Sequence, residues 1–302
     1  MTALPEIPSA LRALMSEVGP RWRQDVPSHV RLMVEQFTPI LSNAPKQGIE
    51  VRRDIAYGDH PLQAFDVFLP SAQVNPRAAL LFAHGGAFVS GDRNRSAEIY
   101  PNVLYCLARH GIVGVNMGYR LATDARYPEA TRDVAAVVSW VRRNSRELGV
   151  DRSRIFLMGH SAGAAHTASY AYDKRHQPED GAGLAGHIVV SGRVRAGNRP
   201  DNPNARKVEA YYGTDNSTYE DASGVCHVGP DSVPIFVAWS EFENPLIDVY
   251  CAELVYRLAA DKGRTPPSLW ARGHNHTSMI AQLNTADAWL EESIVDFIRK
   301  PT

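Results

Sequence analysis

The sequence predicts an α/β fold in which a mostly parallel central sheet is covered by helices on both faces. From about residue 50 onward, short continuous apolar runs alternate with helical patterns. Continuous apolar runs are typical of strands buried on both faces, and strands that alternate with helices form parallel sheets. Two amphipathic stretches precede this region. We therefore expect a small helical N-terminal segment followed by one large α/β unit.

The expected elements follow from this alternation. The first two strands flank a turn-like Gly-Asp-His-Pro at 58–61 and are expected to form an antiparallel edge of the sheet. The expected strands are Val51–Tyr57, Gln63–Leu69, Ala78–Ala83, Ile112–Met117, Ile155–Met158, His187–Val190, Ile235–Trp239 and Ser268–Ala271. The expected helices are Glu98–Arg109, Glu129–Leu148, Ala162–Tyr172, Leu246–Ala260 and Thr285–Ile298.

Two further amphipathic helices are expected near the N-terminus, one capped by Ser9 and one that begins after Ser28 and ends at Pro39. Each has an apolar stripe, which could pack on the body of the fold, form a lid over a binding site or lie on a membrane surface. Residues 193–231 are too long for a simple connection and are expected to join the same cap. The predicted domains are a helical cap segment at 1–48 and a catalytic domain at 49–302.

Composition argues against several classes of partner. The formal net charge is -1, so neither nucleic acid nor an anionic membrane is expected as a partner. No signal peptide or membrane-spanning apolar run is recognisable, and the three cysteines form no CxxC pair, as in proteins of reducing compartments. No metal-ligand spacing such as HExxH is present. We expect a cytoplasmic protein that needs no metal or other cofactor; its oligomeric state is not predicted.

A nucleophile is indicated where the strand Ile155–Met158 runs into Gly-His-Ser-Ala-Gly at 159–163 and a helix follows. This is the G-x-S-x-G motif in its strand–turn–helix context, where a plain tight turn is the weaker alternative. Larger side chains at the two glycines would collide with neighbouring backbone. The serine oxygen would project beside a helix N-terminus, which favours negative charge. Ser161 is the predicted nucleophile.

A set of oxyanion donors is indicated where the strand Ala78–Ala83 ends in His-Gly-Gly-Ala-Phe at 84–88. Acyl transfer creates a negatively charged oxygen, which uncrowded backbone amides can stabilise. A nucleotide-binding turn is disfavoured because neither GxGxxG nor a P-loop lysine is present. His84 is expected to brace the loop, and the predicted oxyanion donors are the amides of Gly85, Gly86, Ala87 and Ala162.

The general base is expected on the loop after the last strand, because the order of the triad in this motif class is serine, acid, histidine. His274 and His276 both lie there. We favour His276 because it directly precedes the closing helical region, and His274 would then be a loop or pocket residue.

The acid of the triad is expected after the strand Ile235–Trp239. Glu243 is the preferred residue, and Asp248 and Glu241 are the alternatives. An acid at this position would fix the histidine tautomer and stabilise its charged form.

These motifs together resemble the hormone-sensitive-lipase-like branch of the α/β-hydrolases, over roughly residues 50–300. HGGAF is similar to the HGGG motif of that branch, and Gly-Tyr-Arg-Leu-Ala at 118–122, Tyr-Pro-Glu-Ala at 127–130 and Asp133 are similar to its YRLAP…FPA…D stretch. The resemblance implies an α/β-hydrolase fold, an N-terminal helical cap and ester hydrolysis through an acyl-enzyme. Three positions depart from the pattern: Ala87 replaces the third glycine, His160 stands where an acid is usual, and Glu243 replaces aspartate.

The sequence leaves the substrate class open. The preferred function is hydrolysis of a small, mostly uncharged carboxylic ester. HGGAF and GHSAGAAH also resemble kynurenine formamidases, so an amide or formamide hydrolase is the alternative. His160 and His166 fit that group at least as well, with packing or surface solvation as the alternative for both. A binding protein on the same fold is disfavoured because all three triad positions are filled. Candidates for an aromatic pocket lining, with core packing as the alternative, are Trp22, Phe88, Tyr211 and Tyr212.

Overall fold

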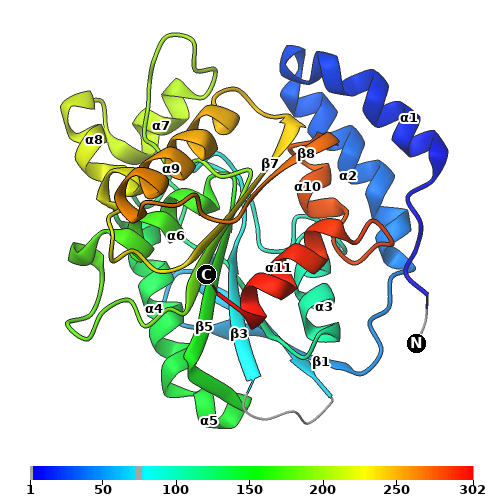
Figure 1. Ribbon diagram of the computed structural model, residues 1–302, viewed down its shortest axis with the longest axis horizontal. Helices are drawn as coiled ribbons and strands as arrows, with labels where there is room; N and C mark the ends of the chain where they lie inside the picture. The colour runs from blue at the N-terminus through cyan, green and yellow to red at the C-terminus, as the bar shows by residue number, and fades with distance from the viewer. Residues whose placement is uncertain (1–2, 72–76, 302) are drawn as a thin grey trace.

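The computed structural model describes residues 3–71 and 77–301. Within these residues a single eight-stranded sheet lies between two layers of helices (Figure 1). The strand order is β1-β2-β4-β3-β5-β6-β7-β8, in which β1 and β2 form the antiparallel edge and all pairs from β4 to β8 are parallel. The predicted fold class is confirmed. The strands are β1 (Ile49–Ala56), β2 (Ala64–Pro70), β3 (Arg77–Ala83), β4 (Val113–Met117), β5 (Val150–His160), β6 (Gly186–Val190), β7 (Ile235–Phe242) and β8 (Ser268–Asn275).

The helices divide between the two faces of the sheet. One face is covered by α1 (Ser9–Val18), α2 (Val26–Ser42), α3 (Pro101–Arg109), α10 (Ser278–Ala281) and α11 (Trp289–Arg299). The other is covered mainly by α4 (Glu129–Arg143), α6 (Gly163–Tyr172) and α9 (Ile247–Lys262). The shorter helical segments are η1 (Gly19–Gln24), α5 (Ser145–Leu148), η2 (Lys174–His176), α7 (Ala205–Tyr212), η3 (Asn216–Thr218), α8 (Tyr219–Ala222) and η4 (Gly224–His227).

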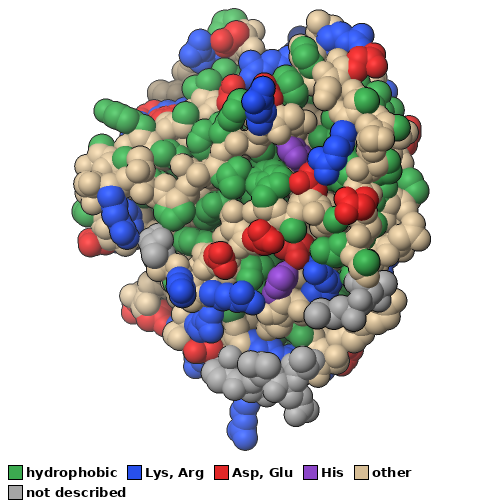
Figure 2. Space-filling view, turned by 45° about the vertical axis from the view of Figure 1, so that its right-hand side comes forward, with side chains coloured by type: hydrophobic (Ala, Val, Ile, Leu, Met, Phe, Trp, Pro, Cys, Tyr) green, Lys and Arg blue, Asp and Glu red, His purple; other side chains and the backbone are tan. Residues whose placement is uncertain are grey.

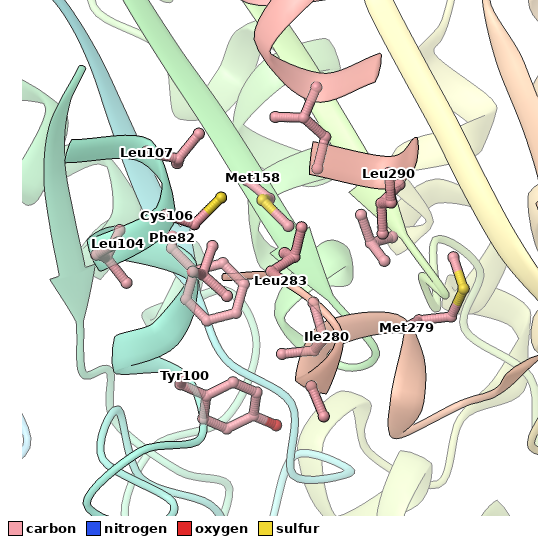
Figure 3. Close-up of a cluster of buried hydrophobic side chains, with 14 of the residues drawn as sticks. Phe82, Tyr100, Leu104, Cys106, Leu107, Met158, Met279, Ile280, Leu283 and Leu290 are labelled. Atoms are coloured by element: carbon pink, nitrogen blue, oxygen red, sulfur yellow. The ribbon is translucent and has the colours of Figure 1, made fainter. Parts of the chain in front are cut away.

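The central strands are buried along their whole length. Every residue of β3, β4 and β6 is buried, as their continuous apolar runs predict. On one face, Phe82 of β3 and Met158 of β5 lie against Leu104 and Leu107 of α3 (Figure 3). Each such side chain contributes about 1.5–3 kcal/mol when fully buried. The sheet is therefore a rigid platform for the loops at the carboxyl ends of its strands.

The N-terminal helices pack on the body of the fold. The apolar stripes of α1 and α2 join the same core, with Met15, Met33 and Phe37 almost fully buried. In Figure 1 these helices lie beside α10, at the end of the sheet where β7 and β8 end. The structure thus confirms that the stripes cover the fold itself.

The predicted ends of these two helices need correction. Ser9 is the first residue of α1, not its cap, since Pro8 holds the cap position. The cap of α2 is Asp25, whose carboxylate accepts the amide of Ser28. Pro39 lies inside α2, which continues to Ser42. The helix continues past proline because Leu41 is fully buried in the core, and its packing outweighs the local cost of the missing N–H.

The remaining expected helices also shift. The helix expected at 129–148 breaks at Asn144, whose side chain donates to the carbonyl of Trp140. The closing helix begins at Trp289, and the short α10 precedes it. Asn275 fixes the turn that leads into α10, because its side-chain oxygen accepts the amides of Thr277 and Ser278.

The surface carries no segregated charge on the face shown in Figure 2, where basic and acidic side chains are interspersed. The helices of residues 3–71 and 77–301 include none with the length and hydropathy that a membrane span requires. No group of three or more histidine, cysteine or acidic side chains there could hold a metal ion. The cysteines Cys106, Cys226 and Cys251 are free thiols. The cytoplasmic location stays a prediction.

Candidate active site

Ser161 lies on a sharp turn between β5 and α6. Its φ of 53° is in the left-handed region, which is unusual for a residue other than glycine. The turn is fixed by the segment after β6: the Ser161 amide donates to the carbonyl of Ser191 (3.1 Å), and the Arg193 amide donates to the carbonyl of Ser161 (2.8 Å). Strain of this kind, held by surrounding hydrogen bonds, is typical of functional positions.

The two glycines around Ser161 are required by close backbone contacts. A Cβ on Gly163 would lie 2.2 Å from the carbonyl oxygen of Ala83, and a Cβ on Gly159 would lie 2.5 Å from Cα of Ala164. Carbon atoms do not approach backbone atoms so closely without displacing them. The predicted reason for the glycines is therefore confirmed by the geometry.

His276 and Glu243 form a buried pair. Nδ1 of His276 donates to Oε2 of Glu243 over 2.6 Å, and the Glu243 side chain is fully buried. The other carboxylate oxygen, Oε1, accepts the Ser191 hydroxyl (2.5 Å) and the Ser240 amide (2.9 Å). The carboxylate thus has three donors and one fixed orientation. It holds the proton of His276 on Nδ1, so that Nε2 is left as an acceptor.

The charge state of Glu243 follows from these contacts. Burial alone would raise the pKa of its carboxyl group. The positive charge and hydrogen bond of His276, together with the hydrogen bonds from Ser191 and Ser240, outweigh burial and lower that pKa below its usual value. Glu243 is therefore ionised at neutral pH, as a group that stabilises an imidazolium must be.

The alternative residues for the base and the acid are engaged elsewhere. His274 Nδ1 lies 3.1 Å from Ser278 Oγ, and the ring of His274 packs edge-on against Trp289. Glu241 accepts the amide of Gly273, and Asp248 pairs with Arg23 at the surface. The geometry therefore favours His276 and Glu243, as predicted from the sequence.

The loop after β3 provides uncrowded backbone amides beside Ser161. In the part of the chain that the structure describes, the amides of Gly86, Ala87 and Ala162 have no hydrogen-bond acceptor. The prediction for Gly85 needs correction, because its amide donates to the hydroxyl of Tyr100 (3.2 Å) and is not free. Three donors rather than four are thus available to a developing oxyanion.

His84 braces this loop, as expected. It is buried, its Nδ1 hydrogen bonds to the Gly85 carbonyl (2.9 Å), and its ring stacks on Tyr119 with 4.3 Å between centroids. Burial lowers its pKa to about 4. The Tyr119 hydroxyl donates to the His84 carbonyl (2.6 Å). The Tyr-Arg-Leu-Ala stretch therefore supports the loop: its tyrosine holds His84, and Arg120 forms an ion pair with Asp133.

His160 contacts the backbone of the proposed base, His276. Its Nε2 lies 3.2 Å from the carbonyl oxygen of His276, and its Nδ1 faces the Tyr100 hydroxyl at 3.5 Å. Burial, followed by the charge of His276, holds its pKa well below the usual value, so His160 is neutral. His166 takes no part in these contacts; it is buried against the rings of Phe88 and Tyr119.

A cavity of about 310 Å³ opens in front of the serine. Ser161 and His276 both line it, together with Gly86 and Ala87. Within the described residues the serine hydroxyl makes no hydrogen bond to the imidazole, a state common in ligand-free hydrolases, where this contact tightens when substrate binds.

The walls of the cavity come from the two expected cap segments as well as from the sheet. Val26 and Val30 of α2 line it on one side. Lys207 of α7 and Asn204, which directly precedes α7, line it on another. Figure 1 shows α2 and α7 near the same end of the sheet. The predicted aromatic candidates are not among its lining residues; three of them, Trp22, Phe88 and Tyr211, are core residues with about 1% exposure.

Sequence reasoning missed two residues of this site. Ser191 directly follows the expected strand His187–Val190, so a polar side chain at a strand's carboxyl end was a usable signal. Tyr100 lies in a loop and binds both the Gly85 amide and His160, a contact that no motif marks.

The fold and this arrangement define the α/β-hydrolase class. Two solved structures share nearly the whole chain: a bacterial heroin esterase (TM-score 0.71, 21% identity, 99% of this chain and 95% of that one) and a thermostable esterase from Pseudomonas putida (TM-score 0.70, 19% identity, 100% and 99%). At such identities the likeness establishes the fold. The family model BD-FAE matches residues 65–250, more than half of the chain, so the protein belongs to the BD-FAE family.

Curated relatives match over shorter regions. Esterase LipC of Mycobacterium tuberculosis is 34% identical over 149 residues, 48% of this chain and 36% of its own length. A probable isoprenylcysteine alpha-carbonyl methylesterase of Arabidopsis thaliana is 31% identical over 133 residues, 44% and 27% respectively. The chain thus matches about a third or less of the length of these relatives.

Proposed function

We propose that this protein is a serine carboxylesterase that hydrolyses small esters through an acyl-enzyme. The observation that carries the proposal is a cavity lined by both Ser161 and His276, where a buried, ionised glutamate holds the histidine and backbone amides of the neighbouring loop are free. The esterase names of the relatives support the same reaction class.

We propose the following roles for the residues of the site. Nε2 of His276 accepts the proton of the Ser161 hydroxyl as its oxygen attacks the ester carbonyl. Glu243 holds the Nδ1 tautomer and stabilises the imidazolium that forms. The amides of Gly86, Ala87 and Ala162 donate to the oxyanion, and losing one such donor typically costs about 100-fold in rate. The imidazolium then protonates the leaving alcohol, and water repeats the steps on the acyl-enzyme.

The helices that line the cavity form the proposed cap. Helices α1 and α2 pack their apolar stripes into the core, and Val26 and Val30 of α2 also line the cavity. Residues 193–231 supply the opposite wall. We propose that these two segments set the size of the acyl or alcohol group.

Turnover of p-nitrophenyl acetate tests the proposal. We expect hydrolysis by the wild type and a loss of about 10,000-fold or more in Ser161→Ala, with unchanged circular dichroism. His276→Ala should be comparably inactive and His274→Ala should retain most of its activity. Equal activity of Ser161→Ala and wild type would contradict the proposal, and a much larger kcat/KM for N-formylkynurenine would replace the ester by the formamide as substrate.

A further inference from the structure

Four basic side chains line the cavity in front of Ser161. They are Arg31 of α2, Arg95 of the loop after β3, Arg193 of the segment after β6 and Lys207 of α7. No aspartate or glutamate is among the lining residues in the described part of the chain. A wall of one sign focuses the electrostatic potential in such a concave site.

These cations are not used by the fold as ion-pair partners. Within residues 3–71 and 77–301, none of the four forms a salt bridge with a carboxylate. The contrast with their surroundings is clear, because Arg195 pairs with both Glu220 and Glu253. The positive charge around the cavity is therefore available to a ligand.

Arg193 is the decisive residue. It is only 3% exposed, and its buried Nη1 has no hydrogen-bond partner among the described residues. An unpaired buried charge is costly, and the ring of Tyr250, 5.3 Å from the guanidinium, offsets only a part of that cost. Burial lowers the pKa of Arg193, but arginine side chains remain protonated in proteins.

Arg193 is also fixed close to the reacting centre. Its backbone amide donates to the carbonyl of Ser161 over 2.8 Å, which places the residue beside the nucleophile. Among the described residues Arg193 forms no ion pair with Glu243, whose two oxygens accept Ser191, Ser240 and His276.

We propose that the cavity accepts esters that carry a carboxylate, and that Arg193 binds this anion while Arg31, Arg95 and Lys207 attract it. This inference rests on the proposed esterase function and deepens it. It replaces the expectation of a mostly uncharged substrate. Guanidinium groups bind carboxylates through paired, charge-assisted hydrogen bonds, and Arg193 lines the cavity with a guanidinium that no carboxylate of the described residues pairs with.

The test compares esters that differ in one charge. In the first pair, ethyl hydrogen succinate is the anion and ethyl butyrate the neutral ester, and their acyl chains have equal length. In the second pair, 4-acetoxybenzoate is the anion and 4-acetoxybenzamide the neutral ester, and the charge lies in the alcohol part. We measure kcat/KM for all four at a pH-stat. In at least one pair, the wild type should prefer the anion by about tenfold or more, and added NaCl should reduce this preference because it screens the exposed cations.

Three variants assign the preference. Arg193→Gln should reduce the anion-to-neutral ratio by about tenfold or more, and Lys207→Gln, at an exposed position, by a few-fold. Arg206→Gln is the matched control, because it removes an exposed charge next to Lys207 that does not line the cavity. Its ratio should equal that of the wild type.

The outcomes separate this inference from the proposed function. Hydrolysis of the neutral esters without preference for either anion would overturn the inference and leave the esterase intact. A preference that persists in Arg193→Gln and Lys207→Gln would also overturn it. Absence of hydrolysis of all four esters would overturn both.

Discussion

Replacing Glu243 by glutamine removes one charge from the centre of the site at almost constant volume. In the wild type the carboxylate accepts three hydrogen bonds, from Ser191, from the Ser240 amide and from Nδ1 of His276. A glutamine has one accepting oxygen and one donating amide. If the oxygen faces Ser191 and Ser240, the amide faces His276 and makes Nδ1 an acceptor.

The magnitude follows from this exchange of donor and acceptor. An acceptor at Nδ1 places the ring proton on Nε2, where it cannot take the proton of Ser161, and the imidazolium also loses its counter-charge. Such a change of tautomer costs about 10,000-fold in kcat, or about 5.4 kcal/mol. The opposite glutamine orientation leaves the Ser191 and Ser240 donors facing an amide group, with a stability loss of about 1–3 kcal/mol.

The test measures kcat for p-nitrophenyl acetate in the wild type and in Glu243→Gln, and urea unfolding measures the stability of both. Glu241→Gln is the matched control, since Glu241 accepts the Gly273 amide and does not touch His276. We expect the control to stay within about threefold of the wild type. Full activity in Glu243→Gln together with an inactive Asp248→Asn would refute the assignment of the acid.

Three further predictions concern folding and the cavity. Gly163→Ala should lower the free energy of unfolding by about 1–3 kcal/mol, because its Cβ would lie 2.2 Å from the Ala83 carbonyl; an unchanged Tm would contradict this contact. Because the pKa of Glu243 is lowered in the folded state, its charge stabilises the fold above the unfolded value of 4.5 and ceases to do so as pH falls through the folded pKa. The stability difference between wild type and Glu243→Gln, measured by urea unfolding, should thus be constant from neutral pH to about pH 5 and narrow only below 4.5; narrowing between pH 7 and 6 would contradict it. Val30→Trp should narrow the cavity and lower kcat/KM for p-nitrophenyl octanoate more than for the acetate, and equal losses would argue against a cap role for α2.

The sequence predicted the sheet and the turn around Ser161 well, because both depend on local pattern. All eight expected strands are present, since continuous apolar runs such as Ala78–Ala83 have no other stable place than a buried sheet. The G-x-S-x-G motif is also local in sequence, so its serine and two glycines were enough to predict the turn. Helix ends were predicted less well: Pro39 lies within α2 because the buried Leu41 beyond it decides where the helix ends.

The site was predictable only where residues follow strands in sequence. Glu243 and His276 come after β7 and β8, so their meeting follows from the strand order. The contact between Tyr100 and the Gly85 amide depends on how the loop between β3 and α3 folds back, and no residue spacing in the sequence predicts it. The unpaired state of Arg193 could not be predicted either, because it depends on which carboxylates are absent from its surroundings.

The proposed reaction requires the hydroxyl of Ser161 to be the nucleophile. A fluorophosphonate reacts covalently with an activated serine, and mass spectrometry of the digested protein locates the adduct. We expect one phosphonyl group per chain, on the peptide that contains Ser161, with loss of turnover in step with labelling. Labelling of another residue, or full turnover without a Ser161 adduct, would contradict it.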